Sequence, residues 1–401
     1  MLDGIKQQLH EKKQLGLLCV NVVRYSRIEE IYGWQAYDGL MKGIAGVITE
    51  LPSLYLRDTD IVSRLMVSGN AFVILISPPR RKAALEESDF EGIKRRVNDQ
   101  LQSELRKRFA SPLYETFGCY VGGAILKESE ELSLERLVYR GLEAGLGEAE
   151  EEQARDADKR AKALEQIINE ENIRVLYHPV VNLVTRKVIG YEALSRGPAD
   201  TEFERPNKLF RVAYEADLVL KLERLCRRKA LEGAGDLPPE HLLFINVEPE
   251  SVEDFQLRQV VSGDVLQPHL KLEQIVLEIT ERSAVVNFGA FRDTMEYFRN
   301  LGFKISIDDA SAGYTSLQCV AELMPDFIKA DMSLIRGIDR DPVKQQLITT
   351  FSSLAEKARV ALVAEGIETL EECKTLIKLG VQLGQGYLFA TLTSPLRESE
   401  I

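Results

Sequence analysis

Residues 304–310 read KISIDDA, a short apolar run of β character that ends in two aspartates. Seven further apolar β-type runs occur after residue 171, with amphipathic helical patterns between them. They are VLYHPVV (175–181), VIGYEAL (188–194), LLFINVEP (242–249), IVLEITE (275–281), FIKADMS (327–333), VALVAEGIE (360–368) and QGYLFA (385–390). Eight strands with intervening helices in this length predict a closed (β/α)8, TIM-like barrel. The competing arrangement is an open doubly wound sheet, but no glycine-rich phosphate loop follows any of these runs.

The chain is too long for one typical domain, and its first part predicts a second α/β unit. Strand-type runs at 16–23, 71–76 and 120–125 alternate with helical patterns at 33–51 and 91–109. A charged, alanine-rich stretch at about 147–171 carries opposite charges three and four residues apart, which favours an exposed connecting helix. We therefore expect one domain over residues 1–158 and the barrel over 159–401.

The polar residues that end the barrel runs define a candidate site. Strand carboxyl ends share one face of such a barrel, and enzymes with this fold keep their active sites there. The residues are Glu192, Asn246, Glu278, Asp308 with Asp309, Lys329 with Asp331, Glu365 with Glu368, and Gln385. So many carboxylates in a partly dry cavity repel one another, and divalent cations would relieve the repulsion. The donors are oxygen atoms, without cysteine or histidine, which favours two Mg²⁺ or Mn²⁺ ions and in-line displacement at a phosphodiester.

Single members of this set have simpler explanations. Asp331 could be a helix N-cap, and Glu281 and Glu368 could be exposed acids in a first helical turn. Gln385 stands between two glycines and could lie in a tight turn. Because polar residues end seven consecutive runs, the functional interpretation is favoured for the group as a whole.

Composition narrows the range of functions. The chain is 45% hydrophobic and 28% charged, and its net charge of −12 disfavours general binding to nucleic acid. Five scattered cysteines predict reduced, mostly buried thiols, and four scattered histidines disfavour an imidazole metal site. We identify neither a signal peptide nor a membrane segment and expect a cytoplasmic protein.

The motifs together resemble the EAL-domain cyclic di-GMP phosphodiesterases, from about residue 161 to the C-terminus. YEALSR, FINVEP, LEITER, IDDASAGYTSL, IKADMSLI, VAEGIET and LGQGYLF each resemble a family motif and stand in the family's order. The resemblance implies conversion of cyclic di-GMP to linear pGpG with Mg²⁺ or Mn²⁺, and a homodimer formed through the EAL domain.

Carried over by position, the resemblance implies a role for each matching residue. Metal ligands would be Glu192, Asn246, Glu278, Asp308, Asp309 and Asp331. Lys329 and Glu365 would orient or deprotonate the attacking water, with Glu192 as the third catalytic residue. Leu194, Arg196 and Gln385 would contact the substrate, while Glu281 and Glu368 would support the site.

Two departures from the family pattern stand beside these matches. The family usually has DDFGTG where this chain has DDASAG at 308–313, and usually has glutamine at the position of His178. Neither change removes a metal ligand, so we expect altered or conditional activity.

The first domain resembles, more faintly, the GGDEF domain of diguanylate cyclases. Residues 68–72 read SGNAF in place of GGDEF, and Asn21 and Val23 occupy the positions of the metal-binding aspartates. A cyclase needs carboxylates to hold cations against a triphosphate. We therefore expect a degenerate, catalytically inactive domain that regulates the barrel. A structural or dimerising remnant is favoured over the alternative of a GTP sensor.

Three functional hypotheses follow. The first is a metal-dependent cyclic di-GMP phosphodiesterase. The second is a catalytically weak or inactive cyclic di-GMP receptor that signals through the connecting helix. The third is a one-metal barrel enzyme acting on sugars or phosphates, which would leave the Asp308–Asp309 pair and Gln385 without a reason.

Overall fold

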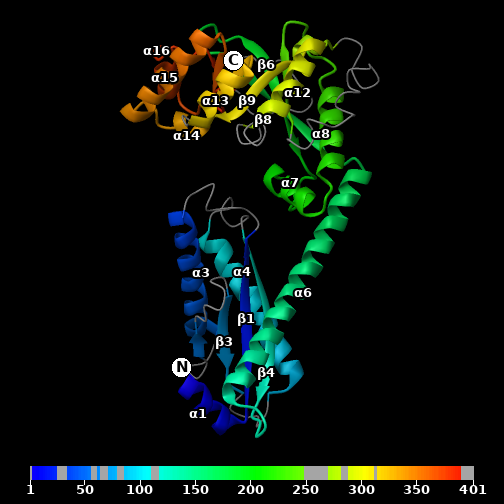
Figure 1. The fold of residues 1–401 in the computed structure, drawn as a ribbon, viewed down its shortest axis with the longest axis vertical. Helices are drawn as coiled ribbons and strands as arrows, with labels where there is room; N and C mark the ends of the chain where they lie inside the picture. The colour runs from blue at the N-terminus through cyan, green and yellow to red at the C-terminus, as the bar shows by residue number, and fades with distance from the viewer. Residues whose placement is uncertain are drawn as a thin grey trace. The chain divides into compact units, whose positions relative to one another are not determined.

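The computed structural model describes residues 2–24, 34–55, 61–63, 71–78, 85–109, 117–247, 270–280, 288–310 and 314–389. The chain forms two compact units, Met1–Arg160 and Ala161–Ile401 (Figure 1). Among the described helices, none is both long enough and apolar enough to span a membrane. All five cysteines lie in the described part; they are buried and none forms a disulfide.

The first unit is built on an antiparallel sheet of four strands in the order β2-β3-β1-β4. The strands are β1 (Gln14–Arg24), β2 (Ile61–Ser63), β3 (Ala71–Ile76) and β4 (Phe117–Lys127). The helices are α1 (Leu2–Lys12), α3 (Trp34–Tyr55), α4 (Glu87–Arg108) and most of α6 (Leu134–Asn169), whose residues after Arg160 belong to the second unit. From β1 to β4 the order is β-α-β-β-α-β. The three predicted strands and two predicted helices are confirmed, whereas α1 and β2 were not predicted.

Alternate residues of β1 pack on opposite faces of this sheet, as the two-residue period of a strand requires. Leu18, Val20 and Val22 contribute to the core that includes residues of α3 and α4. Leu15, Leu17 and Cys19 belong to a second core with residues of α1 and the first turns of α6. One apolar face of these first turns packs into this core, and α6 begins at Leu134, well before the charged stretch that predicted a connecting helix.

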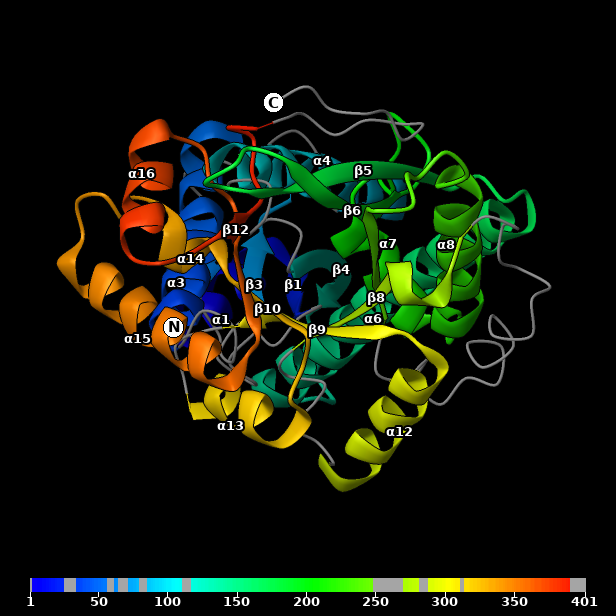
Figure 2. The same cartoon turned by 90° about the horizontal axis from the view of Figure 1, so that it is seen from above.

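The second unit contains the predicted barrel, closed in the order β10-β11-β12-β5-β6-β7-β8-β9 (Figure 2). Its strands are β5 (Arg174–Asn182), β6 (Val188–Arg196), β7 (Leu242–Asn246), β8 (Ile275–Thr280), β9 (Lys304–Ala310), β10 (Phe327–Ala330), β11 (Ala361–Ala364) and β12 (Leu383–Gly384). Strand β5 runs antiparallel to both its neighbours, β6 and β12, and the remaining pairs are parallel. The β5–β6 pair is a hairpin with a turn at residues 183–185, so the reversal follows from its short connection.

The helices of this unit lie around the strands (Figure 2). They are α7 (Pro206–Glu215), α8 (Val219–Gly233), the 3-10 turn η2 (Leu272–Gln274), α12 (Phe288–Leu301), α13 (Tyr314–Leu323), α14 (Met332–Ile335), α15 (Pro342–Ala358) and α16 (Leu370–Lys378). Two large apolar clusters pack strands against helices. A smaller cluster of Val180, Phe244, Val276, Phe327 and Val363 draws one residue from each of five strands.

The last predicted strand, at 385–390, is wrong in position. Strand β12 covers only Leu383–Gly384, and residues 387–389 form a turn. Gln385 therefore stands just after a strand instead of at the start of one. Two glycines flank it, and a Cβ on Gly386 would come within 2.1 Å of the Ile367 carbonyl oxygen, so the chain passes too close to its neighbour for a side chain there.

Candidate active site

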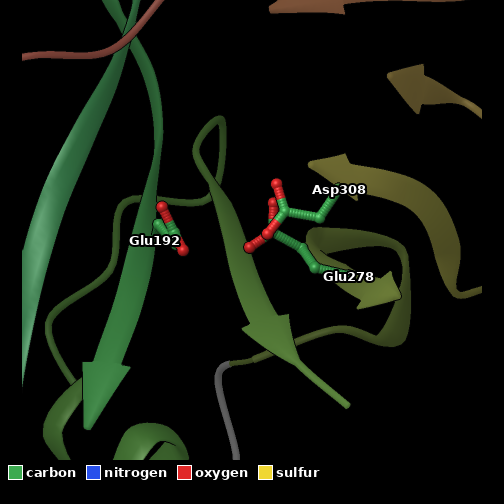
Figure 3. A group of neighbouring side chains, drawn as sticks. All are labelled: Glu192, Glu278 and Asp308. Atoms are coloured by element: carbon green, nitrogen blue, oxygen red, sulfur yellow. The ribbon is translucent and has the colours of Figure 1, made fainter. Parts of the chain in front are cut away.

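Polar side chains from successive barrel strands meet at the carboxyl ends of those strands. Figure 3 shows Glu192 on β6, Glu278 on β8 and Asp308 on β9 directed toward a common space. Asn246 ends β7 and pairs in register with Glu278 of β8. Its Nδ2 atom donates a hydrogen bond to Glu192 Oε1 at 3.0 Å and lies 3.5 Å from Glu278 Oε2. The structure thus brings these predicted residues together.

Lys329 of β10 is the cation at the centre of the group. Its Nζ lies 2.7 Å from Glu365 Oε1 and 3.0 Å from Glu278 Oε1. The same Nζ lies 3.2 Å from both Glu192 Oε2 and Asp308 Oδ1. The whole residue has 0% of its surface exposed. One buried positive charge therefore faces four carboxylates.

The chain bulges where it places Asp308 and Asp309. Between Ile307 and Ala310, strand β9 carries one more residue than the facing segment of β10, which contains Lys329. Asp309 has a φ of 53°, in the left-handed region that aspartate tolerates better than most residues. Consecutive residues of a regular strand point to opposite faces, and a bulge with this conformation breaks that alternation. Both carboxylates can consequently serve one site.

The acids form two groups that share Asp308. Carboxylate oxygens of Glu192, Glu278 and Asp308 lie within 4.8 Å of one another, and so do those of Asp308, Asp309 and Glu365. Each group could hold a metal ion, and the donors are all oxygen atoms, which suit hard divalent cations. Glu278 Oε1 and Asp308 Oδ1 are buried and accept no well-directed hydrogen bond, although Lys329 Nζ lies within ion-pair distance of both. These oxygens have lone pairs available for a cation.

The pKa values of the acids around Lys329 shift in different directions. Burial by itself would raise the pKa of Glu192, but the charge of Lys329 and hydrogen bonds from two neighbouring side-chain amides outweigh burial and lower that pKa. Burial raises the pKa of Glu278 well above its ordinary value, and the charge of Lys329 only partly opposes this. Burial likewise raises the pKa of Glu365 to about 8, with contributions from Asp308 and Glu192. Burial alone would lower the pKa of Lys329, but the surrounding carboxylates outweigh it and raise that pKa. The site has an excess of negative charge that favours cation binding.

Gln385 and His178 extend the group toward β5. Gln385 Nε2 donates to Glu192 Oε2 at 2.7 Å and lies 2.8 Å from Nδ1 of His178. From the sequence, His178 stood out only because the family usually has glutamine at this position, and no role was predicted for it. Its contact with Gln385 depends on the antiparallel course of β5, which places His178 in register with Glu192.

The two other predicted substrate residues lie at the end of the same strand as Glu192. Leu194 and Arg196 are both half-buried residues of β6. The guanidinium of Arg196 donates to the carbonyl of Ser195 at 2.9 Å and forms no ion pair with any residue the structure describes. A cation without a carboxylate partner remains available to an anionic ligand.

Three predicted residues are not placed in the cluster. Asp331 caps the N-terminus of α14 by accepting a hydrogen bond from Ser333 N at 2.9 Å, and neither acid group of the described residues includes it. Glu368 is exposed and forms an ion pair with Arg336. Glu281 lies outside the described residues. For these three, the roles given by the resemblance stay predictions.

Sequence reasoning did not single out Glu372, which holds the loop after β11. Its carboxylate accepts hydrogen bonds from the backbone N–H groups of Gly337, Glu368 and Thr369 at 2.7–3.0 Å. Thr369 and Glu372 also form a capping box at the start of α16. The T-x-x-E spacing at 369–372 is a recognisable signal of this arrangement.

Comparison with known proteins places the second unit in a family. The family described as EAL domain matches residues 161–391. A probable cyclic di-GMP phosphodiesterase of Escherichia coli K12, PdeB, is 29% identical over 57% of this chain and 44% of its own. An uncharacterised protein of Sinorhizobium fredii, y4lL, is 25% identical over 96% of this chain and 47% of its own. The chain spans less than half the length of these two relatives.

A solved structure agrees with this placement. A standalone EAL protein from Vibrio cholerae O395, in its c-di-GMP bound form, is 30% identical, with a TM-score of 0.50. The similarity covers 57% of this chain and 94% of that one. No family is assigned to the first unit by these matches. Through its second unit, the chain belongs to the EAL domain family.

Proposed function

We propose that the protein hydrolyses cyclic di-GMP to linear pGpG with two Mg²⁺ or Mn²⁺ ions. The observation that carries the proposal is the shared position of Asp308 between two acid groups that surround Lys329. Two cation sites with a common carboxylate are an arrangement suited to in-line displacement at a phosphodiester. Family membership and the names of the relatives supply the substrate.

Each ion is assigned to one acid group. Glu192, Asn246, Glu278 and Asp308 would hold the first ion, and Asp308, Asp309 and Glu365 the second. Asp331 is left out of this assignment because its carboxylate caps α14. When bound, the ions would lower the pKa of a water molecule and offset negative charge on the phosphate.

The chain's own groups provide the remaining chemistry. Water attacks one phosphorus atom, the bond to the 3′ oxygen breaks, and pGpG results. Lys329 holds a buried positive charge beside the reacting phosphate, and Glu365 orients the water or accepts its proton. Arg196, which lacks an ion-pair partner in the described part of the chain, contacts a phosphate, with Leu194 and Gln385 lining the substrate. Glu281 and Glu368 support the loops around the site.

For the first unit we propose a degenerate GGDEF-like domain that regulates the barrel. The register of the sheet pairs Asn21 of β1 with Ala71 of β3, so two positions expected to have lost their acids lie side by side. None of the acid groups formed by described residues that could hold a metal ion lies in this unit. Cyclase chemistry therefore lacks its cation ligands there, as far as the described residues extend.

The alternative function is a cyclic di-GMP receptor with little or no turnover, assembled, like the enzyme, as a homodimer through the EAL domain. The departure DDASAG at 308–313 favours it, because the altered positions 310–312 directly follow Asp308 and Asp309. Only Asp308, Asp309 and Ala310 of this segment are described in the structure.

Incubation of the purified full chain with cyclic di-GMP and Mn²⁺ or Mg²⁺ separates the two functions. We expect pGpG to accumulate with the wild-type chain and not with Glu192→Gln. Cyclic di-GMP that binds in calorimetry and stays intact through a long incubation would establish the receptor. Wild-type turnover by Glu192→Gln would contradict the assignment of the site.

A further inference from the structure

His178 reaches the acid cluster from β5, the barrel strand that runs against its neighbours. In the β5–β6 ladder it pairs with Glu192, and its ring contacts Gln385, the first residue after β12. Gln385 thus lies between the two residues: its Nε2 is 2.8 Å from His178 Nδ1 and 2.7 Å from Glu192 Oε2. The three side chains form a continuous chain of polar contacts.

The chemistry of these groups fixes the direction of each hydrogen bond. An ionised carboxylate only accepts, so Glu192 requires the amide nitrogen of Gln385 on its side. The second hydrogen of that nitrogen then points to Nδ1 of His178, which must accept it. An accepting Nδ1 places the proton of the neutral ring on Nε2. Burial lowers the pKa of His178, in agreement with a neutral ring.

The same orientation determines where the amide oxygen lies. Gln385 is 3% exposed, and its Oε1 has no hydrogen-bond partner among the described residues. If the side-chain amide of Gln385 were flipped, its Oε1 would face the Glu192 carboxylate, and two hydrogen-bond acceptors would stand opposite each other. His178 is therefore the second contact that keeps the nitrogen toward Glu192 and leaves Oε1 available to a donor in the site.

We propose that His178 is a positioning residue that locks the Gln385 amide and, through it, the Glu192 carboxylate in the orientation needed to bind a divalent cation. The inference rests on the proposed function, because it takes Glu192 as a metal ligand. Residues that orient metal ligands through hydrogen bonds contribute about 10–100-fold to metal affinity or activity. His178 acts through Gln385 and Glu192 and does not itself contact the ion or the substrate.

Three variants test whether the hydrogen-bond acceptor of His178, and not only the shape of its ring, positions Gln385. His178→Phe keeps a planar ring without an acceptor, and His178→Gln restores an amide oxygen that can accept from Gln385. His241→Phe is the matched control. Like His178, His241 is half-buried and lies 5.9 Å from a tyrosine ring, that of Tyr191, but it belongs to no part of the acid cluster.

The measurements are Mn²⁺ affinity by calorimetry on the purified full chain, and kcat and KM for cyclic di-GMP. We expect His178→Phe to weaken Mn²⁺ binding by about 10–100-fold. Its turnover should fall at limiting Mn²⁺ and recover as Mn²⁺ is raised by about the same factor. His178→Gln and His241→Phe should remain close to wild type in both measurements.

The outcomes distinguish this inference from the function on which it rests. If the wild-type chain makes pGpG and His178→Phe matches it in Mn²⁺ affinity and turnover, the positioning role is overturned and the function stands. An equal loss in His178→Gln and His178→Phe also overturns it, since the acceptor would then not matter. If the wild-type chain binds Mn²⁺ without making pGpG and only His178→Phe loses affinity, the function fails and the positioning role stands. A wild-type chain that does not bind Mn²⁺ overturns both.

Discussion

Asp308 and Lys329 face each other across the bulge between β9 and β10, with Asp308 Oδ1 3.2 Å from Lys329 Nζ. The carboxylate belongs to both acid groups, and the ammonium contacts four acids in all. The two residues therefore connect all the carboxylates of the two acid groups. A change at either one should affect metal binding, charge balance and catalysis together.

Lys329→Met should abolish most of the activity. The variant removes the positive charge beside the reacting phosphate, and loss of a comparable charge-stabilising donor lowers kcat by roughly 10²–10³-fold. It also leaves four acids without their buried partner, which costs about 3–5 kcal/mol when a buried ion pair is broken. We expect a lower thermal unfolding midpoint, with a larger upward shift on adding Mn²⁺ than in the wild type. Lys357→Met, an exposed lysine of α15, is the control. An unchanged rate of pGpG formation in Lys329→Met would contradict the assignment.

The shared position of Asp308 predicts unequal effects of its neighbouring variants on metal stoichiometry. We expect the wild-type chain to bind two Mn²⁺ ions per barrel in calorimetry. Asp309→Asn should lose one ion, because Asp309 belongs to the second group alone. Asp308→Asn should weaken both, because it belongs to both groups. At Mn²⁺ about 100-fold above its Kd, each bound ion should add about 2.7 kcal/mol of stability to the wild type, a gain removed by a chelator. Equal stoichiometry in the two variants would show that the acids do not share an ion in this way.

The regular parts of the barrel could be predicted from sequence, because alternating β and α patterns and polar strand ends are local signals. Glu192, Glu278 and Asp308 follow from the rule that strand carboxyl ends share a face. The antiparallel course of β5 was missed although the sequence carries a signal for it: only residues 182–187 separate the predicted strands at 175–181 and 188–194, too few for a crossover helix. The contact of His178 with Gln385 spans 207 positions and exists only once the barrel closes. The carboxylate of Asp309 reaches the same site as that of Asp308 only because β9 bulges there, and the neighbouring sequence does not indicate a bulge.

Asp331 provides a test of the cap that the structure assigns to it. Asp331→Ser should keep the stability of the chain, because serine is an equally good N-cap, whereas Asp331→Ala should cost about 1 kcal/mol. Both variants should bind Mn²⁺ with the wild-type stoichiometry, because Asp331 stands in neither acid group of the described residues. Urea unfolding and calorimetry measure the two effects. Loss of an ion in Asp331→Ser, with its stability intact, would instead establish Asp331 as a metal ligand.

Glu372 predicts a stability change whose size depends on pH. Burial by itself raises the pKa of this carboxyl, but hydrogen bonds from the N–H groups of Gly337, Glu368 and Thr369, and from the Thr369 hydroxyl, outweigh burial and lower it. A folded-state pKa below the unfolded value means that the ionised group stabilises the fold above the unfolded pKa, near 4.3. That stabilisation is lost as the pH falls through the folded-state pKa.

We therefore expect Glu372→Gln to lower the free energy of unfolding by about 1.5–3 kcal/mol at pH 7, the usual contribution of a hydrogen bond to a charged group. The deficit should shrink steadily below about pH 4, because the wild-type carboxyl then becomes neutral as well. Urea unfolding of both chains between pH 3 and pH 7 measures the difference. Glu371→Gln, an exposed acid in the same helical turn of α16, is the matched control and should show a smaller and flatter effect. A deficit in Glu372→Gln that does not change with pH would mean that its shape, and not its charge, stabilises the loop.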